Sequence, residues 1–448
     1  MRSLTTSPAI SYLPIGRKTF DTASAWQVFE GSLDYLESLE AEISAPEDII
    51  TSVEELKAEL GRMSEAPDLV VFQLTTFADA EFVRKTSETL RAPLIVWSVL
   101  EPEASGRLRL NSLTGGNAAC HYLRSIGHPY AFVYGNPKDP DLRERLERQV
   151  RVRRVIKDLS RLTVAVVGEH PPGFFFADTD DRALELTLGA QVRRLDIRAV
   201  FDEAEAVSEE EWRPIVEEAS ESIVGLSLRD ETVRKFAKLT AYLRRYAEEN
   251  SIGAMAIRNW PEFFDEFGAA ACSAMSLLTD TGLPSANESD IHGAITMYIQ
   301  QQLVGSSAYL GDLAYMDVAQ NSFTFWHDGA GAPSLAGVKS KARVGRHPNR
   351  NIGLTLEVGL KAGQVTVARL GRSRDRFRLL IFRGEALDVP QRFAGTSVVV
   401  RLESSAQEML YSMLDEGWEP HYSLVYGDCV ADLEELGRQL SIEVASYV

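Results

Sequence analysis

The sequence predicts an α/β protein with two Rossmann-like parallel-sheet lobes, followed by a mostly β, barrel-like C-terminal domain. Three observations predict this fold class. Short apolar runs alternate with helical patterns up to about residue 160, and the same alternation resumes at residue 162. After residue 320 the pattern changes to strand-like segments joined by Gly, Arg and Asp turns. We therefore expect domains at 1–160, 161–315 and 316–448.

The first lobe is predicted from strand and helix patterns that follow one another directly. In chain order they are the strand ISYLPIG (10–16), a helix over 23–43, the strand LVVFQL (69–74), a helix over 81–90 and the strand PLIVWSV (93–99). Apolar strands separated by helices are typical of a parallel sheet that is covered on both faces.

The second lobe opens at LTVAVVGEHPPG (162–173) and continues with helices predicted at 181–188, 208–222 and 229–249. Its acidic stretch over 201–222 carries apolar residues at partly helical intervals, namely Val207, Trp212, Ile215 and Val216. That spacing predicts a helix with a solvated face rather than an acidic binding tail.

The last third of the chain predicts a β domain. Its strand-like segments are QVTVARL (364–370), RFRLLIF (376–382), TSVVVRL (396–402) and HYSLVYG (421–427). Helices are predicted near 404–415 and 430–440.

Composition and charge exclude several classes of partner. The 448 residues are 45% hydrophobic and 25% charged, which is typical of a globular protein. Asp and Glu total 65 against 47 Lys and Arg, and the resulting charge of −18 repels nucleic-acid phosphates and anionic membranes. No apolar run approaches the roughly 20 residues that a membrane helix needs. We expect neither nucleic acid nor membrane as a partner.

The cysteines and the N-terminus predict a cytoplasmic protein. Cys120, Cys272 and Cys429 lie far apart and form no CxxC pair, so neither a disulfide framework nor a structural zinc site is indicated. The first residues show no sustained apolar run of the kind found in signal peptides.

The glycines of this sequence do not form a nucleotide-binding motif. Gly168 follows a predicted strand, and Gly115 and Gly116 precede a predicted helix, but neither site completes GxGxxG or a P-loop. Tight strand-to-helix turns are the favoured interpretation. There is also no GxSxG nucleophile motif.

The candidate chemistry lies in carboxylates and histidines of the second half: Glu288, Asp290, Asp312, His327 and His421. Two carboxylates and two imidazoles form a mixed oxygen and nitrogen set that suits Mn²⁺, and also Co²⁺, Fe²⁺ or Zn²⁺. These ligands are too dispersed along the chain for spacing alone to establish a metal site.

Structural interpretations compete with the metal site. Ser285 to Glu288 matches the S-x-x-E capping box of a helix expected at 290–303, and Asp290 is favoured by the dipole at that helix start. His292 is compatible with a surface pair with Glu288. Asp312 fits a turn after a glycine, and either of the other two histidines fits a core or edge position.

Several stretches together resemble the L-fucose isomerase and L-arabinose isomerase superfamily, in its branch of fucose isomerase-related proteins. These stretches are YLPIGRKTFD, NSLTGGNAACHYLRSIGHPYAFVYG, NWPEFFDEFGAAACSAMSLLTDTGLPSANESDIHGAITM, FTFWHDGAGAPSLA, GQVTVARLGRSRDRFRLLIFRGE and PHYSLVYGD. In that family a glutamate of an E-x-D motif, a later acidic residue and a C-terminal histidine bind a divalent metal. The resemblance thus assigns Glu288, Asp312 and His421 as ligands, with His327 from the arabinose-type members.

The resemblance implies a divalent-metal-dependent aldose–ketose isomerase, an intramolecular oxidoreductase acting on a free monosaccharide through a metal-stabilised enediol. Mn²⁺ is the expected cofactor, with Co²⁺, Mg²⁺, Fe²⁺ or Zn²⁺ as substitutes. Glu288 and Asp312 would act as catalytic base and acid as well as ligands, and Asp290 would support them. Arg17, Trp326 and Trp418 are the candidate sugar contacts, although the two tryptophans also suit core packing. A homo-oligomer with shared active sites is implied, with a hexamer as the candidate assembly.

This chain departs from the family at three motifs. It reads ESD at Glu288 where EGD is usual, HDG at His327 where HCG is common, and HY at His421 where HH is common. These changes predict a relative that acts on a different sugar.

Two other functions fit the same residues. A metal-dependent sugar epimerase or lyase would use the same enediol. A non-catalytic sugar-binding sensor, built from two Rossmann-like lobes, would need no metal, but the β-rich third domain and the absence of a signal peptide weigh against it.

Overall fold

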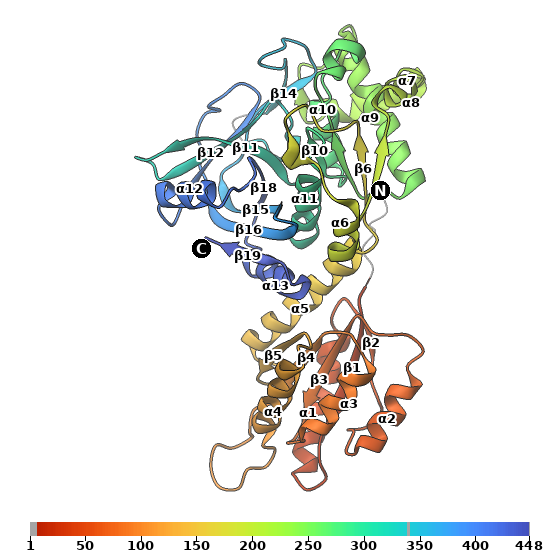
Figure 1. The fold of residues 1–448 in the computed structure, drawn as a ribbon, viewed down its shortest axis with the longest axis vertical. Coiled ribbons are helices and arrows are strands. Elements are labelled where there is room, and N and C mark those ends of the chain that lie inside the picture. The colour runs from red at the N-terminus through yellow and green to blue at the C-terminus, as the bar shows by residue number, and fades with distance from the viewer. Residues whose placement is uncertain (1–6, 338–340, 448) are drawn as a thin grey trace. The chain divides into compact units, whose positions relative to one another are not determined.

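A computed structural model describes residues 7–337 and 341–447 of the chain (Figure 1). The chain forms two compact units, of which the first ends at Asp158 and the second begins at Leu159. The first is a parallel α/β unit. The second holds a parallel α/β part and a β-barrel. These features confirm the predicted fold class, while the division of the second unit at residue 315 stays a prediction.

The first unit is built on a five-stranded parallel sheet in the order β2-β1-β3-β4-β5. The strands are β1 (Ala9–Ile15), β2 (Glu42–Ser44), β3 (Leu69–Leu74), β4 (Leu94–Ser98) and β5 (Tyr130–Tyr134). The three central strands are apolar along almost their whole length because both of their faces are buried.

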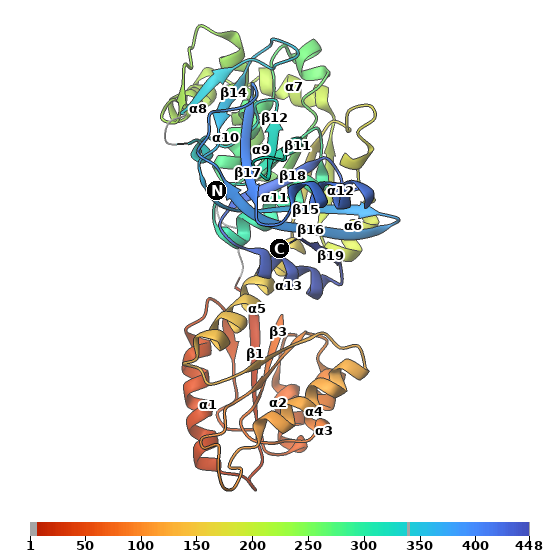
Figure 2. The ribbon, with the colours of Figure 1, turned by 90° about the vertical axis from the view of Figure 1, so that its left-hand side faces the viewer.

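Helices cover both faces of this sheet (Figure 2). They are α1 (Thr22–Glu37), α2 (Val53–Arg62), α3 (Ala80–Thr89), α4 (Ser112–Ser125) and α5 (Pro140–Leu159). Side chains of α1 and α5 share one core with one face of the sheet. Those of α2, α3 and α4 share a second core with the other face. This is the doubly wound arrangement that the alternating pattern predicts.

The predicted turn at Gly115 and Gly116 is wrong. Both glycines lie inside α4, where the helix approaches the sheet closely. A Cβ on Gly116 would lie 2.0 Å from Oγ of Ser98 in β4. These glycines therefore allow close helix packing. Gly168, by contrast, follows a strand with φ of +74° and is a turn residue as predicted.

The second unit begins with a four-stranded parallel sheet in the order β10-β9-β6-β7. Its strands are β6 (Thr163–Val167), β7 (Gln191–Leu195), β9 (Ala254–Ile257) and β10 (Ser285–Asn287). Its helices are α6 (Asp181–Leu188), α7 (Ile197–Glu205), α8 (Glu209–Ser220), α9 (Glu231–Asn250), α10 (Cys272–Asp280) and α11 (Ile291–Val304). The acidic stretch is helical, as predicted, and Trp212 and Val216 of α8 face the core.

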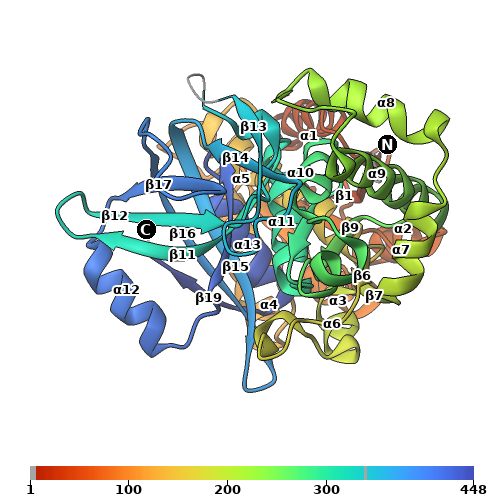
Figure 3. The same ribbon diagram turned by 90° about the horizontal axis from the view of Figure 1, so that it is seen from above.

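The remainder of the second unit is a barrel (Figure 3). Six antiparallel strands follow one another as β16-β15-β18-β11-β12-β17, and pairing of β17 with β16 closes the ring. They are β11 (Tyr309–Asp317), β12 (Ser322–His327), β15 (Gly363–Ser373), β16 (Arg376–Ala386), β17 (Thr396–Leu402) and β18 (His421–Tyr426). Closure removes the exposed edges that an open sheet would have.

Further strands extend the barrel sheet on both sides. They are β19 (Glu443–Ser446) beside β16, and β14 (Thr355–Gly359), β13 (Ala342–Gly345) and β8 (Ile223–Val224) beyond β17. The predicted C-terminal helices are present as α12 (Ala406–Asp415) and α13 (Val430–Leu440). One apolar core runs from the parallel sheet into the barrel, so the two parts hold each other in place. Among the described residues, none of the helices is both long and apolar enough to span a membrane.

Candidate metal centre

Glu288 leaves the end of β10 in a conformation that the sequence did not predict. Ser285 belongs to the strand, and its hydroxyl donates to the carbonyl of Leu283, so the capping-box interpretation is wrong. Glu288 and Ser289 have φ of 59° and 57°, in the left-handed region. Asp290 is the N-cap of α11 instead, accepting from the amide of Gly293 at 2.8 Å.

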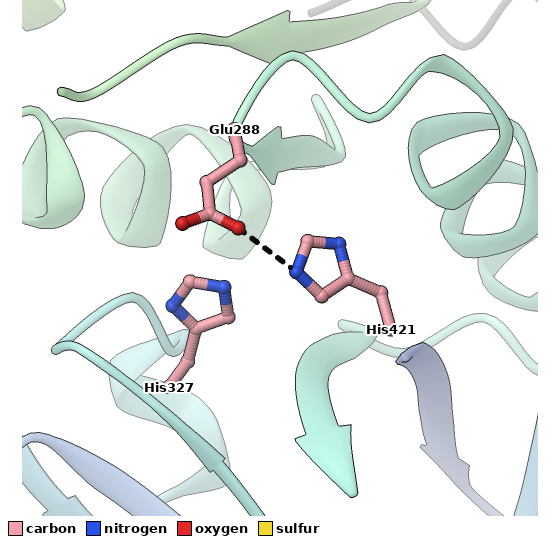
Figure 4. Close-up of side chains that lie close together, drawn as sticks. All are labelled: Glu288, His327 and His421. Carbon is pink, nitrogen blue, oxygen red and sulfur yellow. Dashed lines mark ion pairs between the residues drawn. The ribbon is translucent and has the colours of Figure 1, made fainter. Parts of the chain in front are cut away.

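This left-handed turn directs the Glu288 side chain toward His327 and His421 (Figure 4), and two hydrogen bonds hold the residue in place. The indole Nε1 of Trp260 donates to Glu288 Oε1 at 2.7 Å. The backbone amide of Glu288 donates to Oδ1 of Asn287 at 2.8 Å. Non-glycine residues in this region are strained, and such strain is concentrated at functional sites.

His421 lies opposite Glu288, at the start of β18 (Figure 4). Its Nε2 is 3.1 Å from Oε2 of Glu288 and 3.4 Å from Oδ1 of Asp312. The strand register explains the second contact, because β11 pairs Asp312 directly with His421. Asp312 therefore lies in a strand, and the turn interpretation for it is wrong.

His327 completes the group from the end of β12 (Figure 4). Its ring centroid is 5.5 Å from that of His421. One potential ligand atom each from Glu288, His327 and His421 lies within 4.8 Å of the others, and all three residues are buried. The structure thus brings together two barrel strands and the carboxyl edge of the parallel sheet.

The donor atoms of this group fit a divalent metal ion. Among the described residues, the buried Nε2 atoms of His327 and His421 have no hydrogen-bond partner, and Oε2 of Glu288 lies 3.1 Å from Nε2 of His421. Buried polar atoms are normally satisfied, so two unmet nitrogens beside a carboxylate require an explanation. Imidazole and carboxylate ligands suit Mn²⁺, Fe²⁺, Co²⁺ or Zn²⁺.

The charges of the group also favour a cation. Burial alone would lower the pKa of His421, but the carboxylates of Asp290, Glu288 and Asp312 raise it to about 10. Burial likewise opposes ionisation of Glu288, but the two neighbouring histidines lower its pKa below its usual range. Burial raises the pKa of Asp312 despite those histidines. Several carboxylates thus converge where positive charge is stabilised.

Aromatic side chains cover the centre. They come from the loop between β6 and α6, which contains the short helix η1 (Phe175–Ala177). Phe176 packs edge-on against His421, with ring centroids 5.0 Å apart. Phe174 packs in the same way against Trp260, at 5.3 Å. This loop therefore places two aromatic rings against side chains of the centre.

Asp290 lies behind His421, away from the ligand atoms. Its Oδ2 accepts from Nδ1 of His421 at 2.9 Å and pairs with the guanidinium of Arg369. Asp290 and Arg369 are completely buried. Although burial opposes ionisation, this arginine holds the pKa of Asp290 well below its usual range. The aspartate is therefore an ionised acceptor for His421.

His292 does not form the surface pair that the sequence allowed. It is buried in α11, and its Nε2 lies 2.9 Å from Oγ1 of Thr179. Burial, together with the charge of Arg369, lowers its pKa to about 4. It is a neutral core histidine.

The three predicted sugar contacts lie in different surroundings. Trp326 stacks beside His327 at 6.3 Å and donates from Nε1 to the carbonyl of Ala394. Trp418 is buried under the guanidinium of Arg378, at 3.9 Å. Arg17 belongs to the first unit, where it pairs with Asp79. It lines a cavity of about 730 Å³ there. Their role in sugar binding stays a prediction.

Asp328 and the two asparagines around it were missed by sequence reasoning. Asp328 was noted only as a departure from a motif. Asn259 and Asn287 follow or end strands of the parallel sheet, and both donate to the Asp328 carboxylate. Polar residues at the carboxyl ends of parallel strands were the available signal.

Comparison with known proteins gives full-length matches to one kind of enzyme. The sulfoquinovose isomerase of Priestia aryabhattai is 47% identical over 441 residues, which cover 98% of this chain and 99% of that protein. The sulfoquinovose isomerase of Alkalicoccus urumqiensis is 45% identical over 436 residues, 97% of this chain and 98% of that protein. That of Clostridium sp. strain MSTE9 is 38% identical over 443 residues, 98% and 99% of the two chains. No family model matches the chain.

Proposed function

This chain belongs to the family of the sulfoquinovose isomerases, and from that membership we propose that it is an aldose–ketose isomerase of sulfoquinovose. Sulfoquinovose is a glucose in which a sulfonate replaces the hydroxyl group on C6. The single observation that carries this proposal is the identity of 38–47% to such enzymes over at least 97% of the chain. The departures from the fucose isomerase motifs at Ser289, Asp328 and Tyr422 also favour a different sugar. The wider kinship with fucose and arabinose isomerases rests on the resemblance of motifs.

The reaction moves one proton from C2 to C1 of the open-chain sugar and one between the oxygens on those carbons. Glu288 and Asp312 are our candidates for these transfers, because both carboxylates approach the same nitrogen of His421. Positioned groups of this kind contribute about 10²- to 10⁴-fold each to such a rate. Trp260 fixes Oε1 of Glu288, while Oε2 of the same carboxylate lies 3.1 Å from Nε2 of His421.

We propose that Glu288, His327 and His421 hold a divalent metal ion, with Asp312 beside them. Two buried imidazole nitrogens that have no hydrogen-bond partner among the described residues support this assignment. A bound cation would supply a Lewis acid that polarises the carbonyl group and stabilises negative charge on the sugar oxygens. Mn²⁺ is the proposed ion, with Co²⁺, Mg²⁺, Fe²⁺ or Zn²⁺ as substitutes.

The surroundings of the ligands suit a reaction that must exclude water. Phe176 covers the ring of His421, and Phe174 covers Trp260. Water exclusion strengthens electrostatic interactions and protects reactive species from side reactions. Trp326, stacked beside His327, is the candidate flat surface for the C–H groups of the sugar.

We further propose a cytoplasmic homo-oligomer. Three free thiols, at Cys120, Cys272 and Cys429, suit a reducing compartment. The oligomer, with a hexamer as the candidate, is supported by the resemblance to fucose and arabinose isomerases. Sedimentation velocity of the purified protein would test it, and a monomer at micromolar concentration would contradict it.

The product of the reaction tests the proposed function. Protein loaded with Mn²⁺ is incubated with sulfoquinovose, and the sugar carbons are followed by ¹³C NMR. We expect a ketone signal, or the corresponding ketose hemiketal, to grow at the expense of the anomeric aldose signals. A C2 epimer, a cleaved carbon chain or unchanged sulfoquinovose would each contradict the proposal. Glucose in place of sulfoquinovose tests whether the sulfonate is required.

A further inference from the structure

Asp328, the residue after His327, has no part in the proposed reaction, yet it is buried beside the metal centre. We propose that Asp328 is a positioning residue that fixes the imidazole of His327 with its Nε2 lone pair facing Glu288 and His421. This inference rests on the metal centre of the proposed function.

Five donors converge on the Asp328 carboxylate. Its Oδ1 lies 2.9 Å from Nδ1 of His327 and 2.9 Å from Nδ2 of Asn287, with the thiol of Cys272 at 3.3 Å. Its Oδ2 lies 2.9 Å from Nδ2 of Asn259 and 3.0 Å from Nε2 of His347. A buried carboxylate stays ionised only when such donors replace its hydration. Asp328 is therefore a fixed acceptor.

A fixed acceptor beside Nδ1 decides which nitrogen of His327 carries the proton. A neutral imidazole has one N–H and one lone pair, so donation from Nδ1 to Asp328 leaves the lone pair on Nε2. That Nε2 is buried and has no hydrogen-bond partner in the part of the chain that the structure describes, as expected of a metal ligand before the ion binds.

Two donors also lie near Nδ1 of His327, namely the backbone amide of Asp328 at 2.9 Å and the amide of Asn287 at 3.2 Å. If Nδ1 accepted from either, the proton would move to Nε2. With the proton on Nε2, that buried N–H lacks an acceptor among the described residues. With the proton on Nδ1, the backbone amide of Asp328 gives up its contact with this nitrogen, while the amide of Asn287 keeps the carboxylate as its acceptor, at the shorter distance of 2.9 Å. The ionised carboxylate is the stronger partner for Nδ1.

His421, the second histidine of the centre, has the same hydrogen-bonding arrangement. Nδ1 of His421 donates to Asp290, and its Nε2 likewise has no hydrogen-bond partner within residues 7–337 and 341–447. Asp290 is held by Arg369, just as Asp328 is held by His347 and the two asparagines. A carboxylate behind each ligating histidine orients the ring and increases its basicity in known metal sites. The repetition on two separate strands indicates a role toward the ion rather than in folding alone.

The test is the affinity of the metal-free full-length protein for Mn²⁺, measured by isothermal titration calorimetry. In D328N the side-chain amide can donate to Nδ1 of His327 and thereby move the proton to Nε2. We expect Mn²⁺ to bind about 10- to 100-fold more weakly than to the unmodified protein. The control is D280N, which makes the same chemical change at an aspartate that binds Ser307 and Ser334 instead. D280N should bind Mn²⁺ with unchanged affinity.

The outcomes separate this inference from the proposed function. If the unmodified protein binds no Mn²⁺, the metal centre itself is wrong and the inference falls with it. If it binds Mn²⁺ and a folded D328N binds equally well, only the inference is overturned. Thermal unfolding without metal establishes whether D328N is folded. If it is not, a crystal structure of the Mn²⁺-soaked unmodified protein decides: ligation through Nε2 with Nδ1 against Asp328 supports the inference, and any other state of His327 overturns it.

Discussion

At the scale of single residues, Glu288 shows how a local pattern can mislead about structure and still identify a site. The S-x-x-E motif predicted a helix cap at Ser285, but the N-cap of the helix is Asp290, and Glu288 occupies a left-handed turn after a strand. A capping box requires only local hydrogen bonds, whereas this turn is stabilised by Trp260 from elsewhere in the fold as well as by the neighbouring Asn287. Sequence spacing contains no information about such partners.

We predict that E288Q weakens Mn²⁺ binding and lowers kcat for ketose formation by about 10²- to 10⁴-fold, because the amide removes a charged ligand and a proton-transfer group. The measurements are calorimetry and the initial rate. E231Q is the matched control, since Glu231 is an exposed residue in the first turn of α9 and pairs only with Arg234 among the ion pairs described here. Wild-type activity in E288Q would exclude this residue from the chemistry.

His292 predicts a pH dependence of stability. Its pKa is about 4 in the folded protein and about 6.5 when the chain is unfolded, so below pH 6.5 the unfolded chain binds the proton more readily. Stability therefore falls as the pH decreases from 6.5 toward 4. Between pH 7 and pH 5 the loss from this one group is about 2 kcal/mol.

The measurement for His292 is the free energy of unfolding in urea at both pH values. The variant H292Q has no titrating ring at this position and should lose about 2 kcal/mol less between them. An identical pH dependence in the two proteins would mean that His292 is not the group responsible.

At the scale of elements, the positions of several helices and strands followed from apolar periodicity. Helices α6, α8, α9, α12 and α13 were predicted within a few residues of their ends. The glycines of α4 were misassigned because the same residue serves in a turn and in a close helix contact. Only the neighbouring strand β4 distinguishes the two, and its distance is a property of the tertiary fold.

The close packing of α4 against β4 predicts opposite effects on stability for alanine substitutions at two helical glycines. G116A should lower the free energy of unfolding by about 1 to 3 kcal/mol, because its Cβ would overlap Ser98. G31A, in α1 of the same unit, has nothing within 4 Å of its Cβ and should instead increase stability by about 0.5 to 1 kcal/mol. Thermal or urea unfolding of both variants tests the contrast, and equal effects would contradict the proposed contact.

At the scale of the whole molecule, the fold class was predictable, while the assembly of the centre was not. Alternating strands and helices predicted two parallel sheets, and strand-like segments predicted the barrel. The ligands come from three places far apart in sequence: the end of β10, the end of β12 and the start of β18. Their convergence depends on the strand register and barrel closure, which a single sequence does not contain. The family resemblance supplied the choice of residues that spacing could not.

All proposed ligands lie in the second unit, which predicts that metal binding does not need the first. A fragment of residues 159–448 should bind Mn²⁺ with the affinity of the full-length protein. Calorimetry on both proteins measures this, with circular dichroism as the check that the fragment is folded. A folded fragment that does not bind Mn²⁺ would show that the centre depends on residues before 159.

The central claim is that the group of Glu288, His327 and His421 supports sugar isomerisation by holding a metal ion. Its most direct test is the rate of ketose formation from sulfoquinovose in protein stripped of metal, as Mn²⁺ is added back and the bound metal is counted. We predict negligible activity without metal and a rate that rises in proportion to bound Mn²⁺, saturating at one ion per chain. A stripped protein that forms the ketose as fast as the loaded one would contradict a role of the metal in the reaction.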